Sequence, residues 1–210
     1  MESDLKKLLL SFCCLAFCFA ANAISLESVT QDLSAKDITC GSFEQIKTVS
    51  TSKGSRDIKS SGTFVLCDQG IMWNTVKPVA SKLIVTETKI IQIDSKNNKS
   101  IIDGKDNATF ASFSAAISTV FKNNLSLLKQ QFNIEFTEGQ DQSWKIRLTP
   151  KDATIAAVIK EFFLEGTAKK EAVLDSLVIT EKNGSLIKYV FTDQSYQKTQ
   201  DYDTMLSYLE

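Results

Sequence analysis

The sequence predicts a mainly β fold of the α+β class with one antiparallel sheet, and three observations support this prediction. Short runs rich in Ile, Val and Thr follow one another between residues 41 and 103, with connections too short for crossover helices. A second series of such runs fills residues 132–192. Helical spacing of apolar residues is limited to short segments outside these two series. Because no linker or internal repeat divides residues 24–210, we expect a single domain there.

The first 23 residues have the pattern of a secretory signal peptide. Two lysines precede an apolar run from Leu8 to Ala20, which ends at the small-x-small site Ala21-Asn22-Ala23. The run is shorter than the roughly 20 residues that span a bilayer. We therefore expect cleavage after residue 23 and export across the inner membrane; an uncleaved anchor and an acylated lipoprotein are the alternatives.

The composition argues against several classes of function. The chain has no histidine, which removes Ser-His and Cys-His catalysis and the commonest transition-metal ligand. Its formal net charge of −1 offers no basic field for nucleic acid. We expect no enzyme activity, no cofactor and no metal. An exported enzyme that acts through carboxylates such as Asp68, Glu87 or Asp94 is an alternative, although no motif pairs them.

The first half of the domain is expected to be one helix followed by a meander. Leu26, Val29 and Leu33 share one face of a helix over Ser25–Asp37, and Ser25 is a suitable N-cap. The expected strands are Gly41–Thr51, Ile58–Asp68, Ile71–Val76, Lys82–Glu87, Ile90–Asp94 and Ser100–Asp103, with a turn over Ser52–Asp57 between the first two.

The middle of the chain interrupts the strands. Helical spacing over Phe110–Gln131 fits two pieces that are separated at Asn123-Asn124. Asn183-Gly184 is a strong hairpin-turn signal, and Asp201–Leu209 fits a final helical turn. The strands expected after the interruption are Phe132–Thr137, Trp144–Leu148, Ile155–Leu164, Val173–Glu181 and Leu186–Thr192.

Loss of the leader leaves two cysteines, Cys40 and Cys67. Two cysteines in an oxidising compartment suggest one disulfide. A hairpin that pairs them also pairs Phe43 with Phe64 on the opposite face of the sheet, so the two observations agree. Such a bond contributes roughly 2–4 kcal/mol. Two free thiols are the alternative.

Several motifs resemble the outer-membrane lipoprotein carrier (LolA-like) family. The opening strand Gly41-Ser42-Phe43-Glu44-Gln45-Ile46-Lys47 is similar to the first strand of that family, with Phe, Gln and Lys at alternate positions. The order of the later motifs also matches nearly the whole domain. These motifs are Ser61-Gly62-Thr63-Phe64, Gly70-Ile71-Met72-Trp73-Asn74 with Lys77-Pro78, and Trp144-Lys145-Ile146-Arg147-Leu148-Thr149-Pro150-Lys151.

The resemblance implies a half-open antiparallel β-barrel of about eleven strands whose apolar cavity lies under a helical lid. It also implies a monomeric periplasmic carrier without enzyme activity. Such a carrier takes acylated lipoprotein or lipid cargo from an inner-membrane ABC-type donor and passes it to an outer-membrane acceptor. A periplasmic regulator that senses lipids or lipoproteins with the same half-barrel is the alternative.

One departure concerns the lid. Carriers of the family have an arginine before the turn that leads to the aromatic strand, where it helps to latch the lid, but this chain has Leu66-Cys67-Asp68-Gln69-Gly70 there. The sequence is therefore closer to the broader LolA-like branch. The departure bears on lid control and cargo more than on the fold.

Strand alternation and helical spacing select the candidate site residues, since a carrier needs an apolar lining and an amphipathic cover. A closed core and an ordinary core helix are the alternatives. The expected cavity residues are Phe43, Phe64, Leu66, Ile71, Trp73, Ile91 and Ile93, and the expected lid residues are Phe113, Ile117, Val120, Phe121, Leu125 and Leu128.

Overall fold

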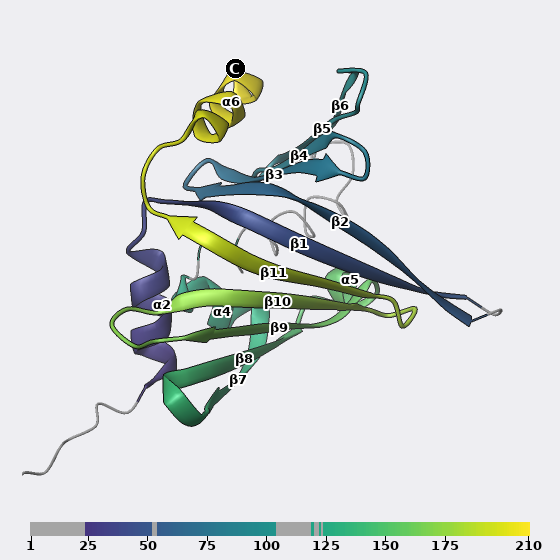
Figure 1. Cartoon of the computed structure of the whole chain (residues 1–210). Coiled ribbons are helices and arrows are strands. Elements are labelled where there is room, and N and C mark those ends of the chain that lie inside the picture. The colour runs from purple at the N-terminus through teal and green to yellow at the C-terminus, as the bar shows by residue number, and fades with distance from the viewer. Residues whose placement is uncertain (1–23, 52–53, 104–118, 120–121, 123) are drawn as a thin grey trace, which may run out of the picture.

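The computed structural model describes residues 24–51, 54–103, 119, 122 and 124–210. Eleven strands form one curved antiparallel sheet in the order β6-β5-β4-β3-β2-β1-β11-β10-β9-β8-β7 (Figure 1). The strands are β1 (Ile38–Thr51), β2 (Gly54–Cys67), β3 (Gly70–Lys77), β4 (Ser81–Val85), β5 (Lys89–Ile93), β6 (Lys99–Asp103), β7 (Phe132–Glu138), β8 (Ser143–Pro150), β9 (Ile159–Thr167), β10 (Val173–Glu181) and β11 (Leu186–Ser195). The helices are α2 (Leu26–Ser34), α4 (Leu125–Gln131), the 3-10 turn η1 (Gln140–Gln142), α5 (Ala153–Ala156) and α6 (Gln200–Leu209).

The sheet consists of two meanders that meet in its middle. Strands β1 to β6 follow one another outward in one direction, and β7 to β11 return from the other end. The last strand closes against the first, with Phe43 opposite Phe191 and Gln45 opposite Tyr189. Strands β6 and β7 stay at the two ends of the sheet, so the barrel is half open. The predicted antiparallel half-open barrel of about eleven strands is confirmed.

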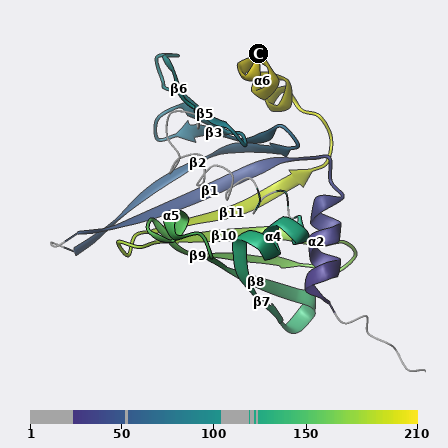
Figure 2. The same cartoon turned by 180° about the vertical axis from the view of Figure 1, so that it is seen from behind.

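Side chains divide into two apolar clusters because alternate residues of a strand point to opposite faces. We call the face that α2, α4 and α5 cover the inner face, and the face that α6 covers the outer face. The inner cluster contains Val29 of α2, Leu128 of α4 and Ile155 of α5. The outer cluster contains Tyr202 and Met205 of α6. Figure 2 shows α2 and α4 side by side across the inner face.

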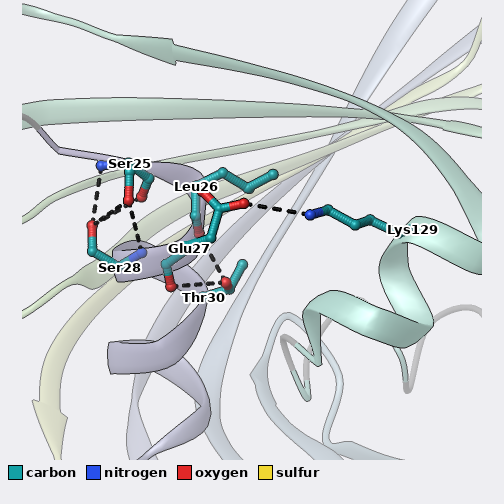
Figure 3. A network of polar contacts seen from close by, with 6 residues as sticks. All are labelled: Ser25, Leu26, Glu27, Ser28, Thr30 and Lys129. Carbon is teal, nitrogen blue, oxygen red and sulfur yellow. Dashed lines mark hydrogen bonds and ion pairs between the residues drawn. The ribbon is translucent and has the colours of Figure 1, made fainter.

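Capping side chains fix where the short helices begin. The Ser25 hydroxyl accepts a hydrogen bond from the Ser28 amide, and the Ser28 hydroxyl accepts one from the Ser25 amide, which completes a capping box at α2 (Figure 3). Asn124 caps α4 through a single bond, in which its side-chain oxygen accepts from the backbone amide of Leu127. The predicted N-cap Ser25 and the helix starts after Ser25 and Asn124 are confirmed.

Asp152 explains one wrong prediction. Its side chain accepts hydrogen bonds from the amides of Thr154 and Ile155, so Ala153–Ala156 forms α5 and not the start of a strand. The strand that was expected from Ile155 begins at Ile159. The hairpin turn at Asn183-Gly184 is confirmed, and Gly184 has the positive φ of 86° that favours glycine. The expected C-terminal helix is also present as α6.

The structure does not contain the predicted disulfide, and its hairpin register differs from the expected one. Strands β1 and β2 continue to Thr51 and Gly54, so the chain turns earlier than expected. Cys40 therefore lies opposite Val65, and Cys67 lies opposite Ile38. Both thiols are free and buried on the outer face. The two cysteines are diagonal neighbours, a relationship that separates Cα atoms by about 7–8 Å, whereas disulfides usually span about 4.4–6.8 Å.

Candidate ligand-binding site

An aromatic cluster occupies the inner face where the two meanders join. Phe64 packs on Phe191 with ring centroids 4.9 Å apart, and Phe191 stacks with Tyr189 at 6.1 Å. Tyr189 also contacts Phe43 at 5.9 Å and Trp73 at 5.7 Å. The five rings come from β1, β2, β3 and β11, which are neighbours in the sheet. They form one continuous apolar surface.

Gly41 makes this surface possible. It lies opposite Phe64 in the β1–β2 pair. A Cβ at this position would lie 2.8 Å from Cε1 of Phe64 and 2.7 Å from the carbonyl oxygen of Thr192. The ring of Phe64 can therefore lie across the backbone of β1 toward β11 only because residue 41 has no side chain.

A polar chain limits the aromatic surface on one side. The side-chain amide nitrogen of Gln45 (Nε2) donates a 2.7 Å hydrogen bond to the Tyr189 hydroxyl. The Ser60 hydroxyl donates a 2.6 Å bond to the side-chain oxygen of Gln45 (Oε1). Burial raises the pKa of Tyr189 to about 12, so its phenol is neutral at physiological pH. The hydroxyl is therefore an uncharged polar group at the edge of the aromatic cluster.

Two hollows border the aromatic cluster. The first has about 30 Å³ of free space under α2, enough for one or two water molecules. Leu33, Phe64, Leu66, Leu174 and Phe191 form its apolar wall, and the rest of its lining is Lys36, Thr39, Ala172, Gln194 and Tyr196. We call this hollow the α2 pocket.

The second hollow measures about 360 Å³ and lies on the side of the cluster toward β4 and β5. Phe43, Trp73, Leu83 and Tyr189 form its apolar wall. Its polar lining is Gln45, Thr75, Ser81, Lys82 and Gln92. We call this hollow the β4 pocket. The candidate site is thus an apolar floor with a narrow end under α2 and a wider end with a polar rim.

Comparison with models of protein families shows to which family this chain belongs. The model of the family "Outer membrane lipoprotein carrier protein LolA" matches residues 36–204. The chain belongs to the LolA family. A comparison with curated protein sequences finds no match.

The solved structures to which this LolA-family chain is similar are distant from it in sequence. A LolA superfamily protein from Nitrosomonas europaea is 8% identical with a TM-score of 0.41, over 85% of this chain and 96% of that one. The lipoprotein LppX from Mycobacterium tuberculosis is 12% identical with a TM-score of 0.43, over 83% and 96%. A DUF1329 family protein from Desulfovibrio piger is 10% identical with a TM-score of 0.47, over 88% and 96%.

Most of the expected cavity residues lie on the inner face of this LolA-family sheet. Phe43, Phe64, Ile71 and Trp73 belong to the inner cluster, and Leu66 packs against it while partly exposed. Phe64 and Leu66 line the α2 pocket, whereas Phe43 and Trp73 line the β4 pocket. The residues expected in one cavity therefore line two hollows on the same face of the sheet.

Ile91 and Ile93 are corrections. Both belong to the outer cluster under α6, and their neighbour Ile90 belongs to the inner cluster. The register with β4, in which Ile84 lies opposite Ile91 and Val85 opposite Ile90, sets this orientation. Alternation could not decide it, because consecutive isoleucines make both faces of β5 apolar.

The lid prediction is only partly within the described structure. Phe113, Ile117, Val120 and Phe121 lie outside the described residues. Leu128 is buried in the inner cluster, and Leu125 is half-buried in the first turn of α4.

The helix that covers the α2 pocket was not expected as a cover. Val29 of α2 is 1% exposed, and Leu33 lines the pocket. Three polar contacts hold α2 from its sides. The amide of Ala172 donates a 2.9 Å hydrogen bond to Asp32, Lys36 forms an ion pair with Glu171, and Lys129 reaches Glu27 at 3.4 Å (Figure 3).

Tyr189 and Phe191 were also missed as site residues. They lie on β11, which meets β1 only when the two meanders close. A usable signal was present, because Ile187, Tyr189 and Phe191 alternate along a strand that the sequence predicted. What the sequence did not provide was the partner strand.

Two of the three carboxylates named in the alternative enzyme hypothesis take part in local polar contacts. Asp94 accepts hydrogen bonds from the amides of Lys96 and Asn98 in the β5–β6 turn, and the bonds from Asn98 lower the pKa of Asp94. Glu87 pairs with Lys122 at 2.7 Å. Within the described ranges, no three His, Cys, Asp or Glu side chains are grouped so as to hold a metal ion. No helix in that part of the chain combines the length and apolarity needed to cross a membrane.

Proposed function

We propose that this protein is a periplasmic carrier that holds the acyl chains of a lipoprotein, or of another acylated lipid, against the inner face of its half-barrel. It takes the cargo from an inner-membrane ABC-type donor and delivers it to an outer-membrane acceptor, after cleavage of residues 1–23. Membership of the LolA family supports this role. The observation that carries the proposal is the continuous aromatic floor of Phe43, Phe64, Trp73, Tyr189 and Phe191 between two hollows.

The small α2 pocket has to widen to admit an acyl chain, and displacement of α2 is one way to widen it. Displacing α2 exposes Val29 and Leu33 at roughly 1.5–3 kcal/mol for each side chain. The exposed ion pair Glu27–Lys129 adds at most about 1 kcal/mol. A buried chain of about twelve CH₂ groups gains about 10 kcal/mol at roughly 0.8 kcal/mol per group. This gain exceeds the cost of exposing Val29 and Leu33 and of breaking the Glu27–Lys129 pair, so an acyl chain can compete with α2 for the surface of Phe64 and Leu66.

The wider β4 pocket then provides the continuation of the path. Its wall shares Tyr189 with the aromatic cluster, and Phe191 connects that ring to the α2 pocket. Ser81, Lys82 and Gln92 are part of its lining, so this end of the path is more polar than the aromatic floor. We expect acyl chains to lie along the rings, with the polar part of the cargo outside them.

Mass spectrometry of lipid extracts tests the proposal directly. The protein is exported to the periplasm and purified without detergent, and its organic extract is compared with that of an unrelated periplasmic protein prepared in parallel. We expect an acylated species in stoichiometric amount. An empty extract, together with no binding of a fluorescent acyl probe, would count against a carrier. Recovery of a regulatory membrane protein without lipid would favour the lipid-sensing regulator instead.

A further inference from the structure

Lys36 has an unusual position for a lysine. It follows α2, and its side chain is only 13% exposed. Among the described residues that line the α2 pocket, it is the one that carries a charge. It also lines an adjoining hollow of about 340 Å³ that contains Asp68, Glu87 and Lys122. Its ammonium group thus lies where the apolar wall of Phe64, Leu66 and Phe191 ends.

Two partners compensate for the burial of this ammonium group. Its Nζ lies 4.3 Å from the centroid of the Tyr196 ring, a cation–π contact. It also forms an ion pair with Glu171 in the β9–β10 connection. A buried ammonium needs such partners, because an unpaired charge is costly away from water.

The ion pair is asymmetric. The Glu171 side chain is 60% exposed, whereas that of Lys36 is 13% exposed. Glu171 can therefore turn away into water and remain solvated, but Lys36 would be left without an anion. Asp32 of α2 is already occupied by the amide of Ala172, and Glu87 by Lys122. Asp68 lines the adjoining hollow but forms no ion pair with Lys36. An incoming anion would therefore compete mainly with Glu171.

We propose that Lys36 is an anion-recognition site at the mouth of the α2 pocket, and that Glu171 occupies this site until an anionic amphiphile replaces it. The carboxylate or phosphate of the ligand pairs with Nζ of Lys36, and its acyl chain lies against Phe64, Leu66 and Phe191. This inference rests on the proposed carrier function and specifies the head group of the cargo. A carboxylate and a phosphate share the required chemistry.

The test compares ligands with one chain and different heads. Palmitate, hexadecyl phosphate and hexadecanol displace a neutral fluorescent acyl probe from the protein of residues 24–210 at pH 7.5. We expect both acids to bind at least about tenfold more tightly than the alcohol, as suits a charge-assisted hydrogen bond in a partly buried site. Inorganic phosphate alone should not compete, because it lacks the chain.

Two substitutions should act in opposite directions. Lys36→Met keeps an unbranched side chain that is one atom shorter and uncharged. It should remove the preference for acids while leaving hexadecanol within about twofold. Glu171→Gln should strengthen the binding of the acids several-fold without changing hexadecanol, because the competing carboxylate is gone. The matched controls are Lys47→Met and Glu181→Gln, which break the 3.8 Å pair Lys47–Glu181 outside both pockets and should change neither ligand.

Each other outcome has a distinct meaning. Equal binding of acid and alcohol by the unmodified protein would overturn the anion site but leave the carrier function standing. A Lys36→Met variant that loses both ligands equally would make Lys36 a packing residue, which also overturns the inference. Competition by inorganic phosphate would assign the site to a free anion. No binding of any acyl ligand would contradict the carrier function itself.

Discussion

The rings of Phe64 and Phe191 contact each other across the backbone of β1, with centroids 4.9 Å apart and planes inclined at 59°. Phe64 belongs to the first meander and Phe191 to the second, so this contact joins the two halves of the sheet on the side proposed to bind acyl chains. The absence of a side chain at Gly41 permits it. The junction therefore serves both the stability of the fold and the continuity of the apolar floor.

The contact should appear as a measurable coupling free energy. We expect Phe64→Leu and Phe191→Leu each to lower the free energy of unfolding, and the double variant to lose less than the sum by about 0.5–1.5 kcal/mol. Urea denaturation of the four proteins gives the coupling. Phe64→Leu combined with Phe132→Leu on β7 is the control and should be additive. Additivity in the Phe64–Phe191 pair would show that the rings do not support each other.

The phenol of Tyr189 should make stability depend on alkaline pH. Burial raises its pKa to about 12 in the folded state, while an unfolded tyrosine titrates near 10. The folded protein therefore holds this proton more tightly, so the stabilisation is complete below about pH 10 and is lost as the pH rises through 12. A shift of this size corresponds to about 2–3 kcal/mol.

Tyr189→Phe should remove that part of the loss of stability between about pH 10 and pH 12. Urea midpoints measured at steps of pH give the slope for both proteins. Tyr196→Phe is the comparison, since Tyr196 is 42% exposed and its removal should change the slope less. An unchanged slope in Tyr189→Phe would mean that the phenol ionises without unfolding the protein.

The two cysteines should react slowly with alkylating reagents. Burial raises the pKa of both thiols, and only the thiolate is nucleophilic. We expect iodoacetamide at pH 8 to label the reduced, folded protein at least about tenfold more slowly than the urea-unfolded protein. Intact mass against time measures both rates, and Cys40→Ser and Cys67→Ser assign them. Rapid labelling of either cysteine in the folded protein would contradict its burial in the outer cluster.

Asp201 should anchor α6 to the sheet. Its carboxylate accepts a 2.6 Å hydrogen bond from the Thr63 hydroxyl and a 3.3 Å bond from the side-chain amide nitrogen of Asn74. Asp201→Ala should therefore lower the free energy of unfolding by about 1–3 kcal/mol, measured by urea denaturation. The exposed Asp203 lies in the same first turn of the helix, so Asp203→Ala is a matched control that removes a similar dipole interaction without a contact to the sheet. Equal losses would leave Asp201 with only its helix-dipole effect.

The sequence predicts strands more successfully than it predicts their partners. Local alternation and turn residues located the strands of both meanders, and capping residues marked the starts of α2 and α4. The expected disulfide between Cys40 and Cys67 came from the number of cysteines, and pairing these two residues gave a register that differs from the observed one, in which Cys40 lies opposite Val65. The orientation of Ile91 was wrong because Ile90 makes the opposite face of the strand apolar as well, and because α6 covers the outer face with apolar side chains.

The site required contacts between distant parts of the chain. Phe191 meets Phe64, and Lys36 meets Glu171, across more than a hundred residues of sequence, and no local pattern encodes either pair. The family resemblance provided the architecture that brings such parts together. It did not indicate Lys36, whose special feature is burial next to an exposed partner.

Loosening α2 should raise ligand affinity while it lowers stability. Val29→Ala shortens a side chain of α2 that packs on the sheet and is 1% exposed. It should lower the free energy of unfolding by about 1–3 kcal/mol. In the proposed carrier the ligand displaces α2. Weaker packing of this helix lowers the free-energy cost of displacing it, so the affinity for a C16 acyl probe should rise several-fold.

Val65→Ala is the matched control, because Val65 is 0% exposed but lies in the outer cluster. It should lower stability to a similar degree and leave affinity unchanged. Fluorescence titration and urea denaturation of both variants give the comparison. If Val29→Ala lowers affinity together with stability, α2 is part of the bound state and not the cover that the ligand replaces.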